Sequence, residues 1–400
     1  MKPLTIRIAG GSLAGLFTAI LLQQDGHDVK VYERSSSGLG GRGAGLVPQQ
    51  DLFEVLDQIG CEDVTHVGVV AKERIYLDAG GRVAQRQKTP QMQISWDYLF
   101  ERVSSRLLAD TYLLGHHVDA VREGPDGVML SFADGRQERA DLVIGADGLG
   151  SAIRKAVNRH SENAFAGYVA WRGLIPETRL PADASLLLDR FAFYIAPGIH
   201  VLGYLVPGPL GETQHGQRRY NWVWYRPTPA DELGRTFTGR DGRHFEYSLP
   251  RGELTEQRRE QLRRDASSLL PPQLALAVEA EENPSIQGIF DYEAEQMVSP
   301  RMALVGDAAF VVRPHTAMGV SKAAGDAMAL RDACGKRTIC PPPFHDIREA
   351  ACRWARQLQP MGGGLPKPPS EHGSKIRDGP ALLHPIFALR LRSGISQWRD

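Results

Sequence analysis

The chain has 400 residues, of which 42% are hydrophobic, enough for one large domain or two interleaved domains with a substantial core. Lysine plus arginine and aspartate plus glutamate both number 47, so the formal net charge is zero. This balance argues against a general nucleic-acid or membrane-surface binder, although it leaves room for a small anionic ligand held locally.

Targeting and redox features are sparse. No apolar run approaches the roughly 18 residues needed to cross a bilayer, and the first ten residues lack the apolar segment and cleavage site of a signal peptide. The cysteines form no C-x-x-C pair and have no zinc-ligand spacing with histidine; they are Cys61, Cys334, Cys340 and Cys352. We therefore expect a cytoplasmic protein with free thiols and no metal site.

The first 33 residues have the pattern of one β-α-β unit. Leu4 to Ala9 is a strand-like run, apolar residues recur at helical spacing from Leu13 to Leu21, and Asp28 to Glu33 alternates like a second parallel strand. The glycine turn AGGSLAG joins the first strand to the helix, with Ser12 where the second glycine of G-x-G-x-x-G would stand. This order of elements makes the glycine motif evidence for a dinucleotide site.

The chain does not continue the strand and helix alternation of a plain NAD dehydrogenase. A glycine-rich loop, SSSGLGGRGAGL, follows Arg34. The elements expected next, in chain order, are a helix from Gln50 to Ile59, a hairpin ERIYLD-AGG-RVAQR, a helix from Tyr98 to Leu108, a hairpin GVMLSF-ADG-RQERADLVIGADG, an antiparallel sheet from Tyr168 to Tyr225, a charged helix from Glu253 to Leu270, a buried strand from Arg301 to Val305 and a helix from Met318 to Leu330. Beyond Cys334 the chain is rich in proline and glycine, and Arg348 to Leu358 has helical character.

These elements predict an α/β fold. A Rossmann-like nucleotide-binding domain is interrupted by an antiparallel β-sheet substrate domain and followed by a helical C-terminal segment. Residues 1–70, 96–160 and 290–332 are assigned to the nucleotide-binding domain. Residues 71–95 and 161–289 are assigned to the β-rich domain, and residues 333–400 to the C-terminal segment.

The glycine turn is the first candidate site. Gly10 permits a tight turn after the strand, and Gly15 permits close packing of the helix on the sheet. The helix N-terminus offers free N–H groups and a partial positive charge to a pyrophosphate, to which the Ser12 hydroxyl could also donate. Glu33 ends the second strand, where a carboxylate would bind ribose hydroxyls. A turn that merely packs is the alternative interpretation.

Two later motifs each combine a buried strand with an acidic turn. In ADLVIGADGLGSAIRKAV the strand ends at Asp147-Gly148, and Arg154 lies on the helix that follows. In RMALVGDAAFVVRPHTAMGVSKAAGDA the strand ends at Gly306-Asp307, Pro314 stiffens the loop, and a helix begins near Gly319. Alone, each motif is also typical of an ordinary junction between a strand and a turn.

Together, the three motifs resemble those of the FAD-dependent aromatic hydroxylases, the single-component flavoprotein monooxygenases of the p-hydroxybenzoate hydroxylase fold. That family has a glycine fingerprint, a D-G motif and a G-D motif in this order, and the resemblance covers about residues 4 to 332. It is greatest to the subgroup of 2,6-dihydroxypyridine 3-hydroxylase, through GGS from Gly10, AGYVAWRGL from Ala166, NWVWYR from Asn221 and RPHTAMG from Arg313. Members of the subgroup have serine at the middle of the turn, so Ser12 fits FAD.

The resemblance implies a set of FAD-binding residues. The glycine turn and Glu33 would hold the ADP half, Asp147 would lie near the pyrophosphate, and Asp307 would bind the ribityl chain. The helix that begins at Gly319 would face the flavin ring, and its dipole would stabilise the reduced anionic flavin. The full set is Gly10, Gly11, Ser12, Leu13, Ala14, Gly15, Glu33, Arg34, Arg42, Gly43, Ala44, Gly45, Asp147, Gly306, Asp307, Pro314, Ala317, Met318, Gly319 and Val320.

The chain departs from the family pattern at two places. Most members have an arginine that contacts the FAD phosphates at the start of a helix where this chain has Trp96, so that contact is either lost or supplied elsewhere, with Arg42 and Arg102 as candidates. The segment after Asp332 does not match the family well.

The resemblance also implies a reaction. NADH or NADPH would reduce the flavin, O2 would form a flavin C4a-hydroperoxide, and a small hydroxylated aromatic or hydroxypyridine-like N-heteroaromatic ring would attack it. His315 is the first candidate for a base or charge that ionises the ring, and Tyr204 and His200 are further candidates. The expected substrate-pocket residues are Tyr168, Arg172, Trp222 and Tyr225. Each of them could instead be a core residue or an ion-pair partner.

Three other functions are compatible with the sequence. They are a flavin-dependent reductase or oxidase of the same fold acting on a non-aromatic substrate, a plain NAD-dependent dehydrogenase, and a flavin-binding protein without catalysis. The choice between NADH and NADPH, the substrate and the oligomeric state are open, although homodimers are common in the family. We expect neither nucleic acid nor membrane as a partner.

Overall fold

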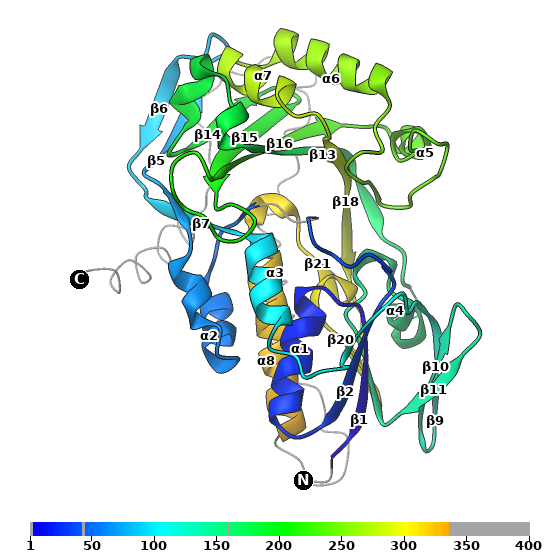
Figure 1. The fold of residues 1–400 in the computed structure, drawn as a ribbon. Coiled ribbons are helices and arrows are strands. Elements are labelled where there is room, and N and C mark those ends of the chain that lie inside the picture. The colour runs from blue at the N-terminus through cyan, green and yellow to red at the C-terminus, as the bar shows by residue number, and fades with distance from the viewer. Residues whose placement is uncertain (1–2, 42–44, 159, 336–400) are drawn as a thin grey trace, which may run out of the picture.

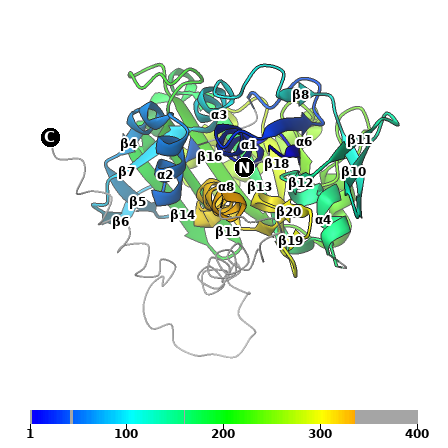
Figure 2. The same ribbon diagram turned by 90° about the horizontal axis from the view of Figure 1, so that it is seen from below.

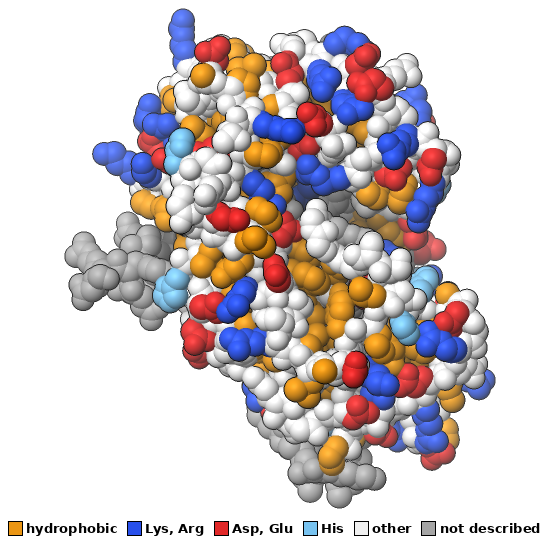
Figure 3. Space-filling model, viewed as in Figure 1, with side chains coloured by type: hydrophobic (Ala, Val, Ile, Leu, Met, Phe, Trp, Pro, Cys, Tyr) orange, Lys and Arg blue, Asp and Glu red, His pale blue; other side chains and the backbone are white. Residues whose placement is uncertain are grey.

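The computed structural model describes residues 3–41, 45–158 and 160–335, which form two stacked parts (Figure 1). The lower part in this view contains a six-stranded sheet with helices beside it, and the upper part contains a larger sheet beneath two helices. Figure 3 shows apolar side chains grouped across the middle of this face, whereas charged side chains gather at the upper right, over α6 (Glu256–Leu269).

The six-stranded sheet has the strand order β19-β20-β12-β1-β2-β8. All neighbouring pairs are parallel except β19 and β20. Its central strands are largely buried but not apolar on both faces: in β1, Ile6 and Ile8 alternate with Arg7, which pairs with Glu138 of the neighbouring hairpin. The strands are β1 (Thr5–Ala9), β2 (Asp28–Glu33), β8 (Tyr112–Leu114), β12 (Leu142–Gly145), β19 (Val298–Ser299) and β20 (Met302–Leu304).

Helix α1 (Leu13–Gln24) is buried around its whole circumference from Leu13 to Leu22. One side packs on the parallel sheet, and the other packs against α2, α3 and α8. Figure 2 shows α1 and α8 side by side, which links the N-terminal turn to the end of the described chain. The other helices of this part are α2 (Gln50–Gln58), α3 (Trp96–Ser104), α4 (Ala152–Val157) and α8 (Gly319–Gly335).

The larger sheet has the order β17-β18-β13-β16-β15-β14-β5-β6, and β21 pairs with β18. One face packs under α6 and α7 (Pro272–Glu279), and the other faces the nucleotide-binding part (Figure 1). Its strands are β5 (Glu73–Leu77), β6 (Val83–Gln87), β13 (Ala164–Pro176), β14 (Arg190–Ala196), β15 (Ile199–Val206), β16 (Arg219–Pro227), β17 (Ser248–Leu249), β18 (Ser285–Glu293) and β21 (Phe310–Val311). A short helix, α5 (Leu233–Thr236), lies at the edge of this part.

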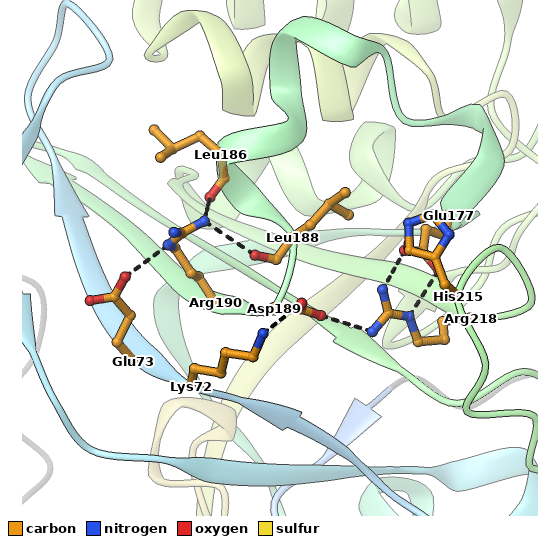
Figure 4. Close-up of polar contacts among 9 residues, drawn as sticks. All are labelled: Lys72, Glu73, Glu177, Leu186, Leu188, Asp189, Arg190, His215 and Arg218. Atoms are coloured by element: carbon orange, nitrogen blue, oxygen red, sulfur yellow. Dashed lines mark hydrogen bonds and ion pairs between the residues drawn. The ribbon is translucent and has the colours of Figure 1, made fainter.

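The hairpin β5–β6 joins this sheet through a parallel pairing of β5 with β14. Charged side chains reinforce the junction (Figure 4). Arg190 donates to Glu73 at 2.9 Å, Lys72 pairs with Asp189 at 3.3 Å, and Arg218 pairs with the same Asp189 at 2.8 Å. A pairing between segments more than 110 residues apart has no local signature, and the sequence did not predict it.

Two three-stranded sheets complete the fold. One joins β3 (Gly45–Leu46), β7 (Gln91–Ser95) and β4 (Val69–Ala71) where the two parts meet, and the other joins β11 (Gln137–Ala140), β10 (Gly127–Phe132) and β9 (Val118–Gly124). The predicted fold class is confirmed. Several bounds differ from the expectations: α3 begins two residues before Tyr98 and ends at Ser104, α6 begins at Glu256, and α8 continues to Gly335. Helix α7 was not expected. The helix expected from Arg348 to Leu358 lies outside the described residues.

Candidate active site

The turn between β1 and α1 is packed against the D-G motif. Gly10 has a φ of +104°, and a Cβ atom there would lie 2.3 Å from the Ala146 carbonyl oxygen and 2.7 Å from the Asp147 nitrogen. Ser12 is the N-cap of α1, but its side chain makes no capping hydrogen bond, and the first turn contains no acidic residue. The N–H groups that begin α1 are therefore available to an anion.

Glu33 lies directly beside this turn. Its carboxylate accepts hydrogen bonds from the backbone N–H of Gly11 at 3.0 Å and of Ser35 at 2.8 Å. The Tyr112 hydroxyl donates to the Gly11 carbonyl at 3.0 Å, so Tyr112 also borders the site. Each carboxylate oxygen retains a lone pair that a ribose hydroxyl can use. Arg34 is exposed next to Glu33.

Six other predicted FAD residues contribute only backbone, lie at the junction or fall outside the described residues. The side chains of Leu13 and Ala14 lie in the apolar cores, so only their backbone N–H groups can face a cofactor. Arg42, Gly43 and Ala44 lie outside the described residues. Gly45 pairs with Ser95 across β3 and β7, at the junction of the two parts.

The Gly10 turn makes a direct prediction. We expect Gly10→Ala to lower the free energy of unfolding by about 2 to 4 kcal/mol and to abolish FAD retention, because the methyl group meets backbone atoms that cannot move independently. Gly26→Ala is the matched control, since Gly26 also has positive φ (+84°) but nothing within 4 Å of the added atom. Urea unfolding and the flavin content after gel filtration measure both effects. Equal losses in the two variants would mean that backbone strain, and not the contact, is responsible.

Arg154 joins the D-G motif to the G-D motif. Its side chain is buried, and its guanidinium donates to the carbonyls of Leu149 at 3.0 Å and Gly148 at 3.2 Å on one side. On the other side it donates to the carbonyls of Asp307 at 2.6 Å and Ala308 at 2.9 Å. Two loops about 160 residues apart are thus held in one arrangement by a single side chain. The sequence analysis noted Arg154 on the helix after the D-G motif but assigned it no function.

The two acidic residues of these motifs differ in burial. Asp147 accepts a hydrogen bond from the Ala152 N–H at 2.8 Å through Oδ2, whereas its Oδ1 is buried without a partner among the described residues. Burial raises the pKa of Asp147, and hydrogen bonds from Ser151 and the Ala152 N–H oppose that rise. The Asp307 side chain is exposed. Both carboxyl groups can therefore meet a bound polar ligand.

A buried ion pair lies behind the G-D motif. Lys322 and Asp326 of α8 form a 2.7 Å pair, with side-chain exposures of 1% and 5%. Lys322 Nζ also donates to the Gly306 carbonyl at 2.8 Å, and the Gly306 N–H donates to Asp326 at 2.8 Å. Both polar backbone groups of Gly306 are held by this pair, which positions Asp307. Sequence reasoning missed the pair, although a Lys and an Asp four residues apart in the mostly apolar first half of α8 were the available signal.

The loop before α8 contributes further groups. Ala317 has a φ of +55°, which is strained for alanine, and its carbonyl accepts from Gln49 Nε2 at 3.0 Å. The Ser321 hydroxyl, in the first turn of α8, is buried without a partner among the described residues. Ser321 is a second residue that the sequence analysis missed. The remaining predicted residues of this segment are Pro314, which starts a short 3-10 helix, Met318, which is buried, Gly319, which is exposed, and Val320, which is half-buried.

The larger sheet presents a patterned face to this site. Alternation along β16 puts Val223 and Tyr225 on the face toward the nucleotide-binding part, and Trp224 in the core under α6 and α7. The registers of β13, β16 and β15 then define three rows on that face. They are Ala170, Tyr225, His200; Arg172, Val223, Leu202; and Leu174, Asn221, Tyr204.

We call the central part of this face the platform. Its floor is apolar and consists of Val223 and Leu202. Five polar side chains surround the floor: Arg172, His200, Tyr204, Asn221 and Tyr225. Among the described residues, no partner is found for Arg172 Nε, His200 Nε2 or either amide atom of Asn221. Unpartnered buried polar atoms beside an apolar floor are typical of a binding site for a small polar ring.

Apart from Arg172, the ionisable groups of the platform are neutral near pH 7. Burial lowers the pKa of His200 to about 4, and His315 acts in the same direction. Burial raises the pKa of Tyr204 to about 12 and also raises the pKa of Tyr225, while Arg172 opposes both shifts. Tyr204 donates to the Gly45 carbonyl at 3.1 Å, which links the platform to the nucleotide-binding part.

These residues fit FAD. The site offers a tight turn with open N–H groups and a carboxylate at the end of the second strand. It also contains an Asp147 oxygen and a Ser321 hydroxyl that are buried without a partner among the described residues. Within the described residues, no group of three or more His, Cys, Asp and Glu side chains could hold a metal ion. The described helices include none long and apolar enough to span a membrane.

Comparisons with known proteins show the family of the chain. Family models match residues 4–182, as an FAD binding domain, and residues 165–291, as FAD binding domain-like. The chain is 30% identical over 402 residues to 2,6-dihydroxypyridine 3-monooxygenase of Paenarthrobacter nicotinovorans, covering 98% of this chain and 97% of the relative. The chain belongs to the FAD-dependent aromatic hydroxylases. It is an FAD-dependent monooxygenase, as predicted.

One solved structure and one further relative are also similar to the hydroxylase. The solved structure of 2,6-dihydroxypyridine-3-hydroxylase from Arthrobacter nicotinovorans matches with a TM-score of 0.79 and 29% identity, covering 90% of this chain and 89% of that one. The 3-amino-4-hydroxybenzoate 2-monooxygenase of Streptomyces cremeus is 29% identical, covering 82% of this chain and 78% of the relative. Membership removes the alternatives of a plain dehydrogenase and of a flavin protein without catalysis.

One predicted pocket residue of the hydroxylase lies elsewhere. Trp222 is fully buried in the core between the sheet and helices α6 and α7, on the face opposite to Tyr225. It therefore does not join Arg172 and Tyr225 at the platform. Tyr168 lies on the platform face at its edge, where it makes an edge-to-face contact with Tyr225 and faces the Arg313 guanidinium.

The start of α3 has Trp96 where most family members have an arginine that contacts the FAD phosphates. Arg102, one of two arginines considered as a substitute phosphate ligand, pairs with Asp63 at 2.7 Å on the surface. Arg219 of β16 reaches the start of α3 instead and pairs with Asp97 at 2.8 Å. The arginine that lies nearest this helix start is thus used to join the two parts of the hydroxylase.

The neutral state of His200 makes a prediction about acid stability. The folded-state pKa of about 4 lies below the unfolded value, so His200 costs stability as the pH falls from about 7 toward 4. We expect His200→Gln to reduce the loss of unfolding free energy between pH 7 and pH 5 by about 1 to 2 kcal/mol. Urea unfolding at both pH values, with the exposed His117→Gln as control, measures this. An unchanged pH dependence would mean that His200 is protonated in the folded hydroxylase.

Proposed function

We propose that the hydroxylase uses NADH or NADPH and O2 to hydroxylate a small hydroxylated aromatic or hydroxypyridine-like N-heteroaromatic ring. The relatives are named for hydroxylation of such rings. The observation that supports the proposal most directly is the platform, an apolar floor surrounded by five polar side chains and turned toward the FAD-binding part.

The dimensions of the platform suit one ring. Arg172 and His200 lie two strands apart, which corresponds to about 10 Å across the floor. A single six-membered ring with one or two polar substituents spans less than this, so its edge can meet polar groups on both sides. A larger fused ring system would have to displace Val47 or other residues that pack against this face.

FAD, when bound, supplies the redox chemistry: it takes a hydride from the nicotinamide and delivers one oxygen atom of O2 to the ring. The residues proposed to hold it are the Gly10 turn, Glu33, Asp147, Asp307 and the start of α8, with Arg154 and the Lys322–Asp326 pair fixing the loops behind them. The packed junction of β3, β7 and the larger sheet excludes water from the ring.

Three side chains are proposed to handle the proton of a ring hydroxyl. His200 is neutral and presents an unpartnered Nε2 to the floor, so it can accept a hydrogen bond from the substrate. Tyr204 remains protonated and helps to orient the ring hydroxyl of the substrate beside His200. His315, exposed in the loop before α8 and close enough to His200 to lower its pKa, can pass the proton to solvent.

A substrate screen tests this function. Purified holoenzyme is offered hydroxylated benzenes and pyridines with NADH or NADPH, and nicotinamide oxidation and product mass are measured under 18O2. We expect at least one ring to stimulate oxidation and to gain one labelled oxygen atom. Oxidation that only forms H2O2 with every ring would overturn the proposal.

His315→Ala should lower the coupled rate about 10- to 100-fold if His315 moves the proton.

The remaining proposals concern organisation. We propose that residues 1–70, 96–160 and 290–332 form the FAD-binding domain and that residues 71–95 and 161–289 form the substrate domain. The pairing of β5 and β6 with the larger sheet supports the second assignment, whereas β7 pairs with β3 and β4 at the junction. We also propose a cytoplasmic enzyme, in which Cys61 and Cys334 stay free thiols.

A further inference from the structure

Arg172 differs from the other arginines of its sheet. It lies on β13 beside Val223, and because Val223 is small, the long guanidinium side chain can extend over the floor of the platform. The registers put Tyr204 and Tyr225 one residue pair away on either side. Burial raises the pKa of both phenols and the charge of Arg172 opposes that rise, so the guanidinium is near both rings. Arg172 is thus the cation of the platform.

The comparison with neighbouring arginines is informative. Arg219 pairs with Asp97 at 2.8 Å, Arg226 pairs with Asp265 at 2.5 Å, and Arg313 pairs with Asp291 at 2.5 Å. Arg172 has no ion pair or side-chain hydrogen bond to any residue in the described part of the chain, and its Nε is buried without a partner. A partly desolvated guanidinium without a carboxylate is costly, so such groups are usually paired, either with a side chain or with a ligand.

The other ionisable groups of the platform do not compensate for this charge. Burial keeps Tyr204 and Tyr225 protonated, and His200 is neutral above about pH 4. One edge of the floor is therefore positive, and the opposite edge, at His200 and Tyr204, offers only neutral hydrogen-bonding groups. The platform has the charge pattern of a site for a ring with one negative substituent.

We propose that Arg172 is a specificity-determining residue that binds an oxyanion of the aromatic substrate, either a ring carboxylate or an ionised ring hydroxyl. The inference rests on the proposed function, because it takes the ligand to be the hydroxylated ring. Both groups are oxygen anions that accept charge-assisted hydrogen bonds from a guanidinium. A neutral ring of the same shape leaves Arg172 unpaired and is rejected.

Equilibrium binding to the holoenzyme tests the inference, with the flavin absorbance as readout and no nicotinamide present. The carboxylate arm compares 6-hydroxynicotinate with its neutral isostere 6-hydroxynicotinamide. The hydroxyl arm follows the Kd of 2,6-dihydroxypyridine below and above the pH of its first ionisation. In the wild type we expect the anion to bind about 10- to 100-fold more tightly in one arm, and that arm identifies the oxyanion.

Arg172→Met should reduce the preference to within about threefold without equal loss of affinity for the neutral ligand. Arg172→Gln, which keeps a polar group of similar length, serves if the methionine variant yields no holoenzyme. Arg226→Met is the matched control, since it removes a guanidinium from the neighbouring strand that points to the opposite face and packs 4.5 Å from the Trp224 ring. The control should keep the wild-type preference.

The outcomes separate the two proposals. A wild-type enzyme without preference in either arm, or an Arg172 variant that keeps the preference, overturns the inference even if hydroxylation is observed. An Arg172-dependent preference without labelled oxygen in any product sustains the inference about the ligand and overturns the proposed reaction. Equal loss in the Arg226 control would mean that the total charge of the sheet, and not Arg172, selects the anion.

Discussion

Replacement of Arg154 with methionine is expected to lower the free energy of unfolding by about 3 to 5 kcal/mol and to abolish FAD retention. The guanidinium supplies hydrogen bonds to four carbonyls of the D-G and G-D loops, and methionine leaves these carbonyls buried with fewer donors. Each unsatisfied buried group costs about 1 to 3 kcal/mol. Since the total stability of a domain is about 5 to 15 kcal/mol, the variant should be close to unfolding at ordinary temperature.

Urea unfolding of the apo and FAD-loaded forms measures the Arg154 effect. Arg301→Met is the matched control because Arg301 donates to two backbone carbonyls, those of Pro125 and Asp141, but at a more open position. We expect the control to change stability by less than about 1 kcal/mol. Retention of stability and of flavin by the Arg154 variant would show that the two loops hold their arrangement without the shared donor.

Lys322→Met is the second substitution that we expect to cause a large loss of stability and of bound FAD. The substitution leaves Asp326 buried without its cation, and breaking a buried ion pair in this way costs about 3 to 5 kcal/mol. The Gly306 carbonyl loses its donor at the same time, so Asp307 is positioned less well and FAD should dissociate more readily. We expect the flavin of the variant to be lost on gel filtration under conditions in which the wild type keeps it.

The pH dependence distinguishes a lost charge from a lost side chain. Without Lys322 the negative charge of Asp326 is buried without its cation, so the variant should lose more stability relative to the wild type at neutral pH than at low pH. The double variant Lys322→Met/Asp326→Asn keeps an acceptor for the Gly306 N–H and should be more stable at pH 7 than Lys322→Met alone. A pH-independent loss in the single variant would mean that packing, not the buried charge, is decisive.

Local patterns in the sequence were sufficient for much of the fold. The strand at Asp28–Glu33 has the predicted bounds, and the helix from Gln50 differs from the expected one by one residue at its end. Both are set by periodicity within a few residues. The pairing of Arg154 with carbonyls of Asp307 and Ala308, more than 150 residues away, depends on how loops approach each other and leaves no periodic trace.

Some features of the candidate site could also be predicted from the sequence, and others could not. The glycine turn and the two acidic turns lie at the ends of strands, and parallel strands with a common edge bring their ends together, so their convergence could be predicted. Asn221, Ser321 and the Lys322–Asp326 pair escaped prediction because their significance lies in unpartnered atoms or buried charges, which become visible only when the neighbours are known.

The sequence by itself determined the FAD-binding core, the order of its motifs and the family. Only the tertiary structure decided which aromatic residues of NWVWYR face the substrate. Asn221 to Tyr225 are all buried because β16 is covered on both faces, so no alternation between apolar and polar residues marks one face as the core. The packing of α6 and α7 on one side and of the FAD-binding part on the other therefore assigned Trp222 to the core and Tyr225 to the platform.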